Sequence, residues 1–295
     1  MSAVFFIVAH AGHPHLEPQT VLRWWTFEPV ELALLAITLL LYCAGLIRNH
    51  KIVARWQATA FFAAWLALVI ALVSPLDALG AILFSAHMVQ HEALIVIAAP
   101  LLVLGRPLLV FLWGFPQSWR VPLSRWTQSS AVAKNWRAIT GPFLVTILHA
   151  LALWLWHLPS LYEATLRNDF VHALQHSSFL FTATLFWWAL IHGRYGRAGY
   201  GVAVAYTWFT ALHSGLLGAL IAFAPRLVYP IYATRTAAWG LDAIEDQQLA
   251  GLLMWIPAGI LFIILGIALF AAWLGEAERR VAFTSSEALR KEQRS

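Results

Sequence analysis

Long apolar blocks separated by short polar connections dominate the pattern of this 295-residue chain. Each block runs for roughly 18–25 residues, the length of an α-helix that crosses about 30 Å of hydrocarbon. The blocks do not alternate polar and apolar residues as a membrane β-barrel would, and a helix pairs its own backbone groups in lipid. We predict an all-α polytopic membrane protein, a seven-transmembrane-helix bundle with spans at 29–47, 55–73, 82–104, 141–158, 171–192, 200–223 and 247–273.

The basic residues orient these predicted spans. Most of the 19 Lys and Arg fall in alternate connections and after the last span, and the cytoplasmic side of a membrane protein carries the excess of Lys and Arg. We therefore predict that the N-terminus is outside and the C-terminus cytoplasmic. The chain then divides into an outward-facing segment (1–28), a membrane domain (29–273) and a charged cytoplasmic tail (274–295), with the connection 105–140 lying along the cytoplasmic surface.

Composition agrees with this class. Hydrophobic residues make up 61% of the chain and charged residues only 11%, whereas a soluble domain carries about 25% charged residues. The basic pI of about 9.7 comes from connections that serve topology, so we expect membrane lipid and no nucleic acid as a partner. The single cysteine, Cys43, excludes an internal disulfide and any CxxC motif. Ala9-His10-Ala11 is similar to a signal-peptidase site, but the short apolar run before it lacks Lys and Arg, which favours an uncleaved outer tail.

Histidines gather in the predicted outer half of the membrane. With a rise of about 1.5 Å per helical residue, the spans place these histidines in that half: His87, His91, His149, His157, His172, His176 and His213. Only His50 and His192 fall at the inner surface. His10, His13 and His15 form an HxxHxH pattern in the outer tail, which is either a metal-capture site or a flexible polar tail.

The sequence HxxQH occurs twice, from His87 to His91 and from His172 to His176. A spacing of four places both imidazoles of a pair on one helical face, one turn apart, as chelation from a helix requires. Neutral imidazole binds copper, zinc, iron and nickel. A lone intramembrane histidine more often bonds a neighbouring helix, but two chelating pairs at similar depth favour a metal or haem site, because polar residues in lipid are costly.

Other residues fit the same region less specifically. Glu92 could be a ligand, a proton acceptor or the partner of an imidazolium. Met88 and Met254 carry thioethers, soft ligands suited to Cu(I), although filling gaps in the packing explains them slightly better. Asp77 and Asp246 lie at the outer rim, where they could orient imidazole N–H groups or cap helices.

Several motifs stand in a fixed order along residues 30–275. They are Ser74-Pro75-Leu76-Asp77; Ser85-Ala86-His87-Met88-Val89-Gln90-His91 with Ala99-Pro100; His157-Leu158-Pro159-Ser160-Leu161-Tyr162 leading to His172 and His176; and Asp246-Gln247-Gln248-Leu249-Ala250-Gly251. This series resembles the CtaG family of cytochrome c oxidase assembly factors, of the multi-span type rather than the single-span copper-delivering proteins that share the name.

The resemblance implies a multi-pass protein of the bacterial plasma (inner) membrane that supports maturation of haem-copper oxidases. Its expected partners are the oxidase catalytic subunit and periplasmic copper donors. The resemblance also implies that the protein is a metallochaperone rather than an enzyme. It would carry copper, as Cu(I), to the catalytic copper site of the oxidase. That copper is held by three histidines within the membrane, towards the outer side, at the depth predicted here for the histidines of this chain.

Two alternatives from other classes stay open. A membrane b-type cytochrome could hold haem between two histidines such as His91 and His176. A His-rich membrane di-metal enzyme could use Glu92 as a bridge or a base. A transporter is less favoured, because the sequence shows neither an inverted repeat nor a broken helix.

Overall fold

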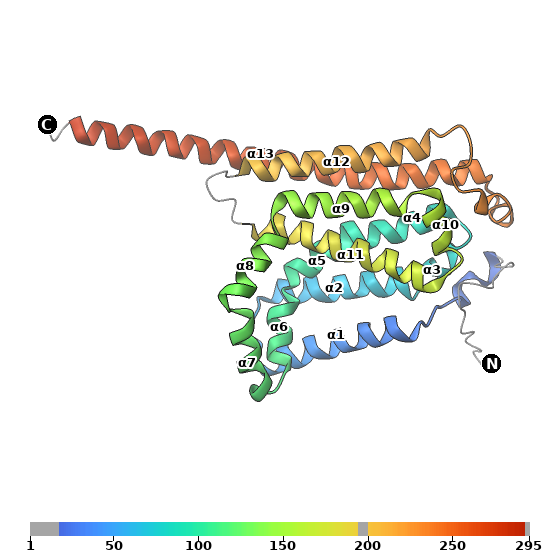
Figure 1. The fold of residues 1–295 in the computed structure, drawn as a ribbon, viewed down its shortest axis with the longest axis horizontal. Coiled ribbons are helices and arrows are strands. Elements are labelled where there is room, and N and C mark those ends of the chain that lie inside the picture. Colours follow the sequence, from blue (N-terminus) through green and yellow to red (C-terminus); the bar gives the residue numbers. More distant parts are fainter. Residues whose placement is uncertain (1–17, 194–199, 293–295) are drawn as a thin grey trace.

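The structure is a computed structural model that describes residues 18–193 and 200–292, with side chains described as far as Arg279. It is 83% helical, and no strand occurs in these two ranges. The long helices run side by side in an elongated bundle, and the last one projects beyond the others at one end (Figure 1).

Helices occupy every apolar range that the sequence predicts. They are α1 (Pro29–Arg48), α2 (Arg55–Leu72), α4 (Phe84–Glu92) continued by η3 (Ala93–Ala98) and α5 (Ala99–Gly105), α9 (Pro142–Trp156), α11 (Asp169–His192), α12 (Tyr200–Ala222) and α13 (Ala243–Glu292). Within the described ranges, five stretches are long and apolar enough to cross a membrane: Pro29–Arg48, Arg55–Leu72, Phe84–Gly105, Tyr200–Ala222 and Ala243–Arg279. The pair Ser130–Ile139 and Pro142–Trp156, bent by 55°, makes a sixth if it is one span. The chain is therefore a helical membrane protein.

The third of these stretches changes its helical pitch in the middle. Residues Ala93–Ala98 form a π-helical segment between two α-helical parts. Pro100 follows it, and a proline lacks the N–H and clashes with the carbonyl four residues earlier, so the helix widens before it. The widened segment begins directly after His91 and Glu92. Single π-helical turns are frequent at functional sites.

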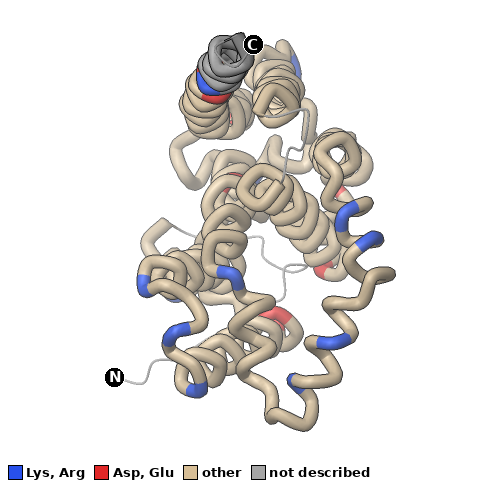
Figure 2. Tube along the Cα trace, turned by 90° about the vertical axis from the view of Figure 1, so that its left-hand side faces the viewer, with Lys and Arg blue, Asp and Glu red and all other residues tan. Residues whose placement is uncertain are grey.

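Short elements close the two ends of the bundle. At one end lie α3 (Pro75–Gly80), α10 (Pro159–Thr165) and the connection from α12 to α13, which contains η5 (Pro230–Tyr232) and η6 (Ala237–Trp239). At the other end, α6 (Pro107–Gly114), α7 (Gln117–Thr127) and α8 (Ser130–Ile139) follow one another across the bundle (Figure 1). Figure 2 looks onto this second end, where Lys and Arg gather along the connecting helices.

The pair α12 and α13 packs through glycines. A Cβ on Gly218 would lie 2.9 Å from the carbonyl oxygen of Gly251, and a Cβ on Gly251 would lie 2.5 Å from the backbone nitrogen of Ala222. Larger residues would force the backbones apart, so glycine sets this close approach, as is usual between membrane helices. The helix α13 continues past the predicted boundary at 273 as far as Glu292, because the residues that follow are rich in Ala, Glu and Arg, which favour helix.

Candidate metal centre

Five of the predicted histidines lie together in one buried cluster, called the histidine cluster below: His87, His91, His157, His172 and His176. The rings within each HxxQH pair are 4.4 Å apart in α4 and 4.1 Å apart in α11. Between the helices, the ring of His87 lies 5.3 Å from that of His172, and the ring of His91 lies 5.4 Å from that of His176. His157, which follows the last residue of α9, brings its ring to 5.8 Å from that of His91.

Three members of the histidine cluster could coordinate one ion. One ring nitrogen from each of His87, His172 and His176 lies within 4.8 Å of the other two. All three residues are buried. With metal–nitrogen bonds of about 2 Å, two nitrogens on one ion are at most about 4 Å apart, so side-chain adjustments would have to bring the three nitrogens closer together.

Hydrogen bonds prepare two of the imidazoles as ligands. The Nδ1 of His157 lies 2.7 Å from the carbonyl oxygen of Leu153; a carbonyl only accepts, so Nδ1 carries the proton and Nε2 keeps its lone pair. The Nε2 of His87 lies 3.2 Å from Oε1 of Gln175, which likewise leaves Nδ1 of His87 as the atom with the lone pair. Such outer partners fix the tautomer and orientation of metal-binding histidines.

Within the cluster, His91 differs in that both of its ring nitrogens are buried without a hydrogen-bond partner among the residues that the structure describes. A buried polar group without a partner costs about 1–3 kcal/mol, and most native structures avoid it. A metal ion bound to one nitrogen would satisfy that atom. His91 is also the member whose ring contacts reach both the α11 pair and His157.

The first turn of α4, which carries the cluster, is held by α13. The carboxylate of Asp246 accepts hydrogen bonds from the backbone N–H groups of Phe84 (2.6 Å) and Ser85 (3.2 Å) and from the hydroxyl of Ser85. These N–H groups have no partner within their own helix. Asp246 thus caps a helix other than its own, and this is the role among those predicted for it that the contacts support.

Gln90, the glutamine of the first HxxQH motif, links α4 to neighbouring elements by hydrogen bonds. The side-chain amide of Gln90 donates to the carbonyl oxygen of Ala71 (2.8 Å) and to the carboxylate of Asp77 (2.9 Å). The second, Gln175, contacts His87. The sequence shows the glutamine in both motifs but not what it contacts, since its partners are distant in the chain.

Three tyrosines cover the histidine cluster at the end of the bundle formed by α3 and α10; they are called the tyrosine cap below. The ring of Tyr162 lies 5.0 Å from that of His87, and its hydroxyl is 2.9 Å from that of Tyr232, which donates to the carbonyl oxygen of Gly80. The hydroxyl of Tyr229 donates to the carbonyl oxygen of His157. Burial raises the pKa of Tyr229 and of Tyr232, so both hydroxyls keep their protons.

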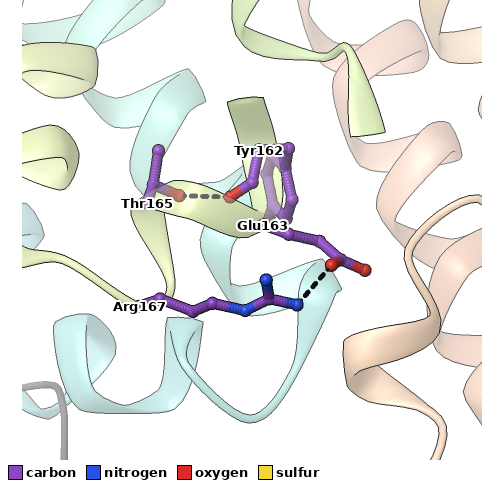
Figure 3. A network of polar contacts seen from close by, with 4 residues as sticks. All are labelled: Tyr162, Glu163, Thr165 and Arg167. Atoms are coloured by element: carbon purple, nitrogen blue, oxygen red, sulfur yellow. Dashed lines mark hydrogen bonds and ion pairs between the residues drawn. The ribbon is translucent and has the colours of Figure 1, made fainter. Parts of the chain in front are cut away.

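Local contacts hold Tyr162 in place (Figure 3). The hydroxyl of Thr165 donates to the carbonyl oxygen of Tyr162 at 2.7 Å, and Arg167 pairs with Glu163 at 2.6 Å. Sequence reasoning did not single out the tyrosine cap, although Tyr162 stands in one of the quoted motifs. Its other members lie about 70 residues away in the connection between α12 and α13.

The remaining predicted ligands lie apart from the histidine cluster. Glu92, His149 and Met254 line a separate cavity of about 20 Å³. His213 is buried on α12, the helix that contributes Thr210 and Ser214 to the wall of this cavity. Met88 is 1% exposed and belongs to the apolar core. His10, His13 and His15 fall outside the residues that the structure describes.

A larger, mainly apolar cavity of about 340 Å³ reaches the cluster from the side. It lies between α1, α2, α5, α6 and α11. His176 and Ser177 form part of its wall, and Glu31 and Thr38 are the other polar residues along it. The histidine cluster therefore has two different neighbours: the tyrosine cap, and a cavity lined mainly by apolar side chains.

Comparison with known proteins decides the family. Residues 20–276 match the family described as "Cytochrome c oxidase caa3 assembly factor (Caa3_CtaG)". The chain belongs to this family. The match confirms the resemblance to the CtaG family that the motifs indicate, and it includes every member of the histidine cluster and of the tyrosine cap.

Relatives of the CtaG-family chain include two uncharacterized mycobacterial proteins. It is 24% identical to a protein of Mycobacterium leprae over 288 residues, which are 91% of this chain and 42% of the relative. It is 25% identical to a protein of Mycobacterium bovis over 284 residues, which are 92% of this chain and 43% of the relative. The chain thus spans less than half the length of these relatives. No solved structure is significantly similar to it.

Proposed function

We propose that this protein is a copper-binding assembly factor of the bacterial plasma membrane, which holds Cu(I) in the histidine cluster and passes it to the catalytic subunit of a haem-copper oxidase. Family membership supports the role in oxidase assembly. The observation that carries the copper assignment is the group of His87, His172 and His176, whose ligand nitrogens lie within 4.8 Å of one another.

The chemistry of the cluster suits cargo that must be released. Imidazole binds copper well, and Cu(I) accepts two or three ligands. His91 and His157 provide additional imidazoles beside the group of three. An ion could therefore exchange one ligand for another without losing all its bonds, which lowers the barrier to transfer.

The packing of the rings favours a single ion over haem. Neighbouring imidazoles in the cluster are 4.1–5.8 Å apart between ring centres. A porphyrin bound between two of these rings would have to occupy the space in which the other imidazoles of the cluster are packed. The di-metal enzyme is less favoured because Glu92, its expected bridging carboxylate, lines a different cavity.

The proposal includes seven crossings with the histidine cluster on the outer side. The helix α11 is 24 residues long and lies among the spans (Figure 1), although its histidines and other polar residues lower its hydropathy. The first described residues and the end of α13 lie at opposite ends of the bundle (Figure 1). Lys and Arg gather at the end opposite to the cluster (Figure 2), as the cytoplasmic side requires.

A copper titration tests the proposal. The purified full-length protein in detergent would be titrated with Cu(I) against a chromophoric Cu(I) chelator. We expect His87→Ala and His176→Ala to weaken binding by about tenfold or more, because each removes one bond and the geometry of a chelating pair. The matched control is His50→Ala, an exposed histidine outside the cluster. Equal affinity in all three variants and the native protein would refute the copper assignment.

The same variants test the role in cells. Under copper limitation, His87→Ala and His176→Ala should reduce oxidase activity at equal protein level, whereas His50→Ala should not. Added copper should partly restore activity, since mass action compensates for a raised dissociation constant. Normal oxidase activity in both cluster variants under copper limitation would contradict the proposal.

A further inference from the structure

A second polar cavity lies inside the apolar core, apart from the histidine cluster. Four elements contribute to its wall: α4 with η3, α9, α12 and α13. Its polar or sulfur-bearing lining residues are Glu92, His149, Thr210, Ser214 and Met254. At about 20 Å³ it has room for about one water molecule or one bare ion.

Two of the residues that line this cavity carry a polar atom without a partner. The Oε2 of Glu92 and the hydroxyl of Thr210 are buried with no hydrogen bond to any residue that the structure describes, and Thr210 is 0% exposed. Each such atom in an apolar interior costs about 1–3 kcal/mol. Because both residues line one cavity of this size, a single occupant could satisfy both atoms.

The imidazole of His149 is prepared as a ligand. Its Nδ1 lies 3.2 Å from the hydroxyl oxygen of Thr182, and that hydroxyl donates to the carbonyl oxygen of Ser178. The hydroxyl oxygen therefore accepts from Nδ1–H, and Nε2 of His149 keeps its lone pair. This is the outer support that orients metal-binding histidines in known sites.

The composition of the wall selects the class of ion. An imidazole together with a thioether suits a soft ion such as Cu(I). One carboxylate neutralises one positive charge, and Glu92 has no ion-pair partner among the residues that the structure describes. A monovalent ion would thus leave no net charge in the low-dielectric interior, whereas a divalent ion would leave one uncompensated.

We infer that the protein has a second Cu(I) site, formed by Glu92, His149 and Met254 and separate from the histidine cluster. It is close to the first, since Glu92 follows His91 in the chain and His149, on α9, lies about two turns before His157 at the end of that helix. The two sites share the helices α4 and α9 but no ligand. This inference does not require that the histidine cluster binds copper.

Sulfur coordination gives the sharpest test. The chain contains three methionines, Met1, Met88 and Met254, and one cysteine. The full-length protein loaded with Cu(I) would be examined by X-ray absorption spectroscopy at the copper edge, together with the copper-to-protein ratio. We expect copper–sulfur scattering in the native protein, and its loss together with one equivalent of copper in Met254→Leu. Leucine has nearly the volume of methionine, so the core should tolerate the change.

Met88→Leu is the matched control, because Met88 is buried in the core but does not line the cavity. It should keep both the sulfur signal and the copper ratio. Glu92→Gln, which removes the charge and keeps the shape, should also lose one equivalent. An unchanged copper ratio and sulfur signal in Met254→Leu would overturn the inference and leave a cavity that holds water only.

The outcomes for the two sites are distinguishable. His87→Ala should lose copper from the histidine cluster and keep the sulfur signal. If His87→Ala changes nothing while Met254→Leu loses copper, the second site stands and the proposed function fails. If the reverse is found, the histidine cluster is the only one of the two sites that binds copper.

Discussion

Asp246 and Ser85 are 161 residues apart in the chain, yet the carboxylate of Asp246 accepts hydrogen bonds from both the backbone N–H and the hydroxyl of Ser85. Through this contact α13 fixes the first turn of α4, which includes His87. The helix that carries two of the five members of the histidine cluster is therefore positioned by a residue far along the sequence. The stability of the cluster depends on this buried carboxylate.

Replacing the carboxylate should destabilise the fold. Asp246→Asn leaves a single acceptor oxygen for three donors and points an NH₂ group at them, so we expect a loss of about 1–3 kcal/mol. Thermal unfolding in detergent, followed by tryptophan fluorescence, measures the change. Asp242→Asn is the control, because Asp242 caps α13 at an exposed position and asparagine caps equally well. Identical melting of both variants would contradict the role assigned to Asp246.

Gln175 should tune copper affinity without being a ligand. Gln175→Leu removes the partner that orients His87, and loss of such outer partners typically weakens metal binding by about 10–100-fold. The Cu(I) competition titration described above measures it. Gln128→Leu, an exposed position on the connecting helices, should leave the affinity unchanged. An unchanged affinity in Gln175→Leu would show that His87 is oriented by other contacts.

The close approach of α12 and α13 predicts a graded response to one added methyl group. Gly218→Ala should destabilise the protein by about 1–3 kcal/mol through overpacking, because its Cβ would meet backbone at 2.9 Å. Gly259→Ala, where the nearest atom is 3.9 Å away, should be neutral or slightly stabilising in a helix. The two variants would be compared by thermal unfolding. A Gly218→Ala protein as stable as the native one would mean that the helices separate easily.

Topology can be tested independently of copper. We expect a C-terminal alkaline phosphatase fusion to be inactive and a C-terminal green fluorescent protein fusion to fluoresce, since the Lys- and Arg-rich end should be cytoplasmic. An active phosphatase at this position would reverse the orientation and place the histidine cluster on the inner side.

Much of this architecture is readable from the sequence because it follows local rules. The apolar blocks predicted every long helix to within a few residues, apart from the continuation of α13 beyond 273. The HxxQH spacing predicted which imidazoles share a helical face. The sequence did not predict that His149 and His213 lie apart from the histidine cluster. This separation depends on how α4, α9 and α12 are rotated relative to one another. Depth alone placed His149 and His213 with the others.

The contacts that the sequence did not predict share one property: they join residues that are far apart in the chain. Tyr229 and Tyr232 lie in a connection whose sequence shows no chemical motif. Asp246 is recognisable as a rim carboxylate, but its choice of α4 as a partner is a tertiary fact. The widened segment after Glu92 could have been suspected from Pro100, which stands inside an otherwise continuous apolar block.

The tyrosine cap should affect the kinetics of metal exchange more than affinity. Tyr162→Phe keeps the ring over His87 and removes the hydroxyl that bonds to Tyr232. We expect a chelator to remove Cu(I) faster from this variant at nearly unchanged equilibrium affinity. Tyr42→Phe is the control, because it loses an equally buried hydroxyl hydrogen bond, to the carbonyl oxygen of Gly105, far from the cluster. Equal removal rates in both variants would show that the cap does not limit access.

The tyrosine cap also separates the affinity of the proposed metal site from its rate of release, two properties that are often assumed to vary together. In the proposed copper site, the imidazoles would determine how tightly the ion is held, whereas the hydroxyl contacts among Tyr162, Tyr232 and Gly80 would determine how often a path to the water opens. A site arranged in this way can retain a weakly bound ion for a long time. Residence time and dissociation constant can then change independently, and a partner that displaces the cap would release the ion without competing for it.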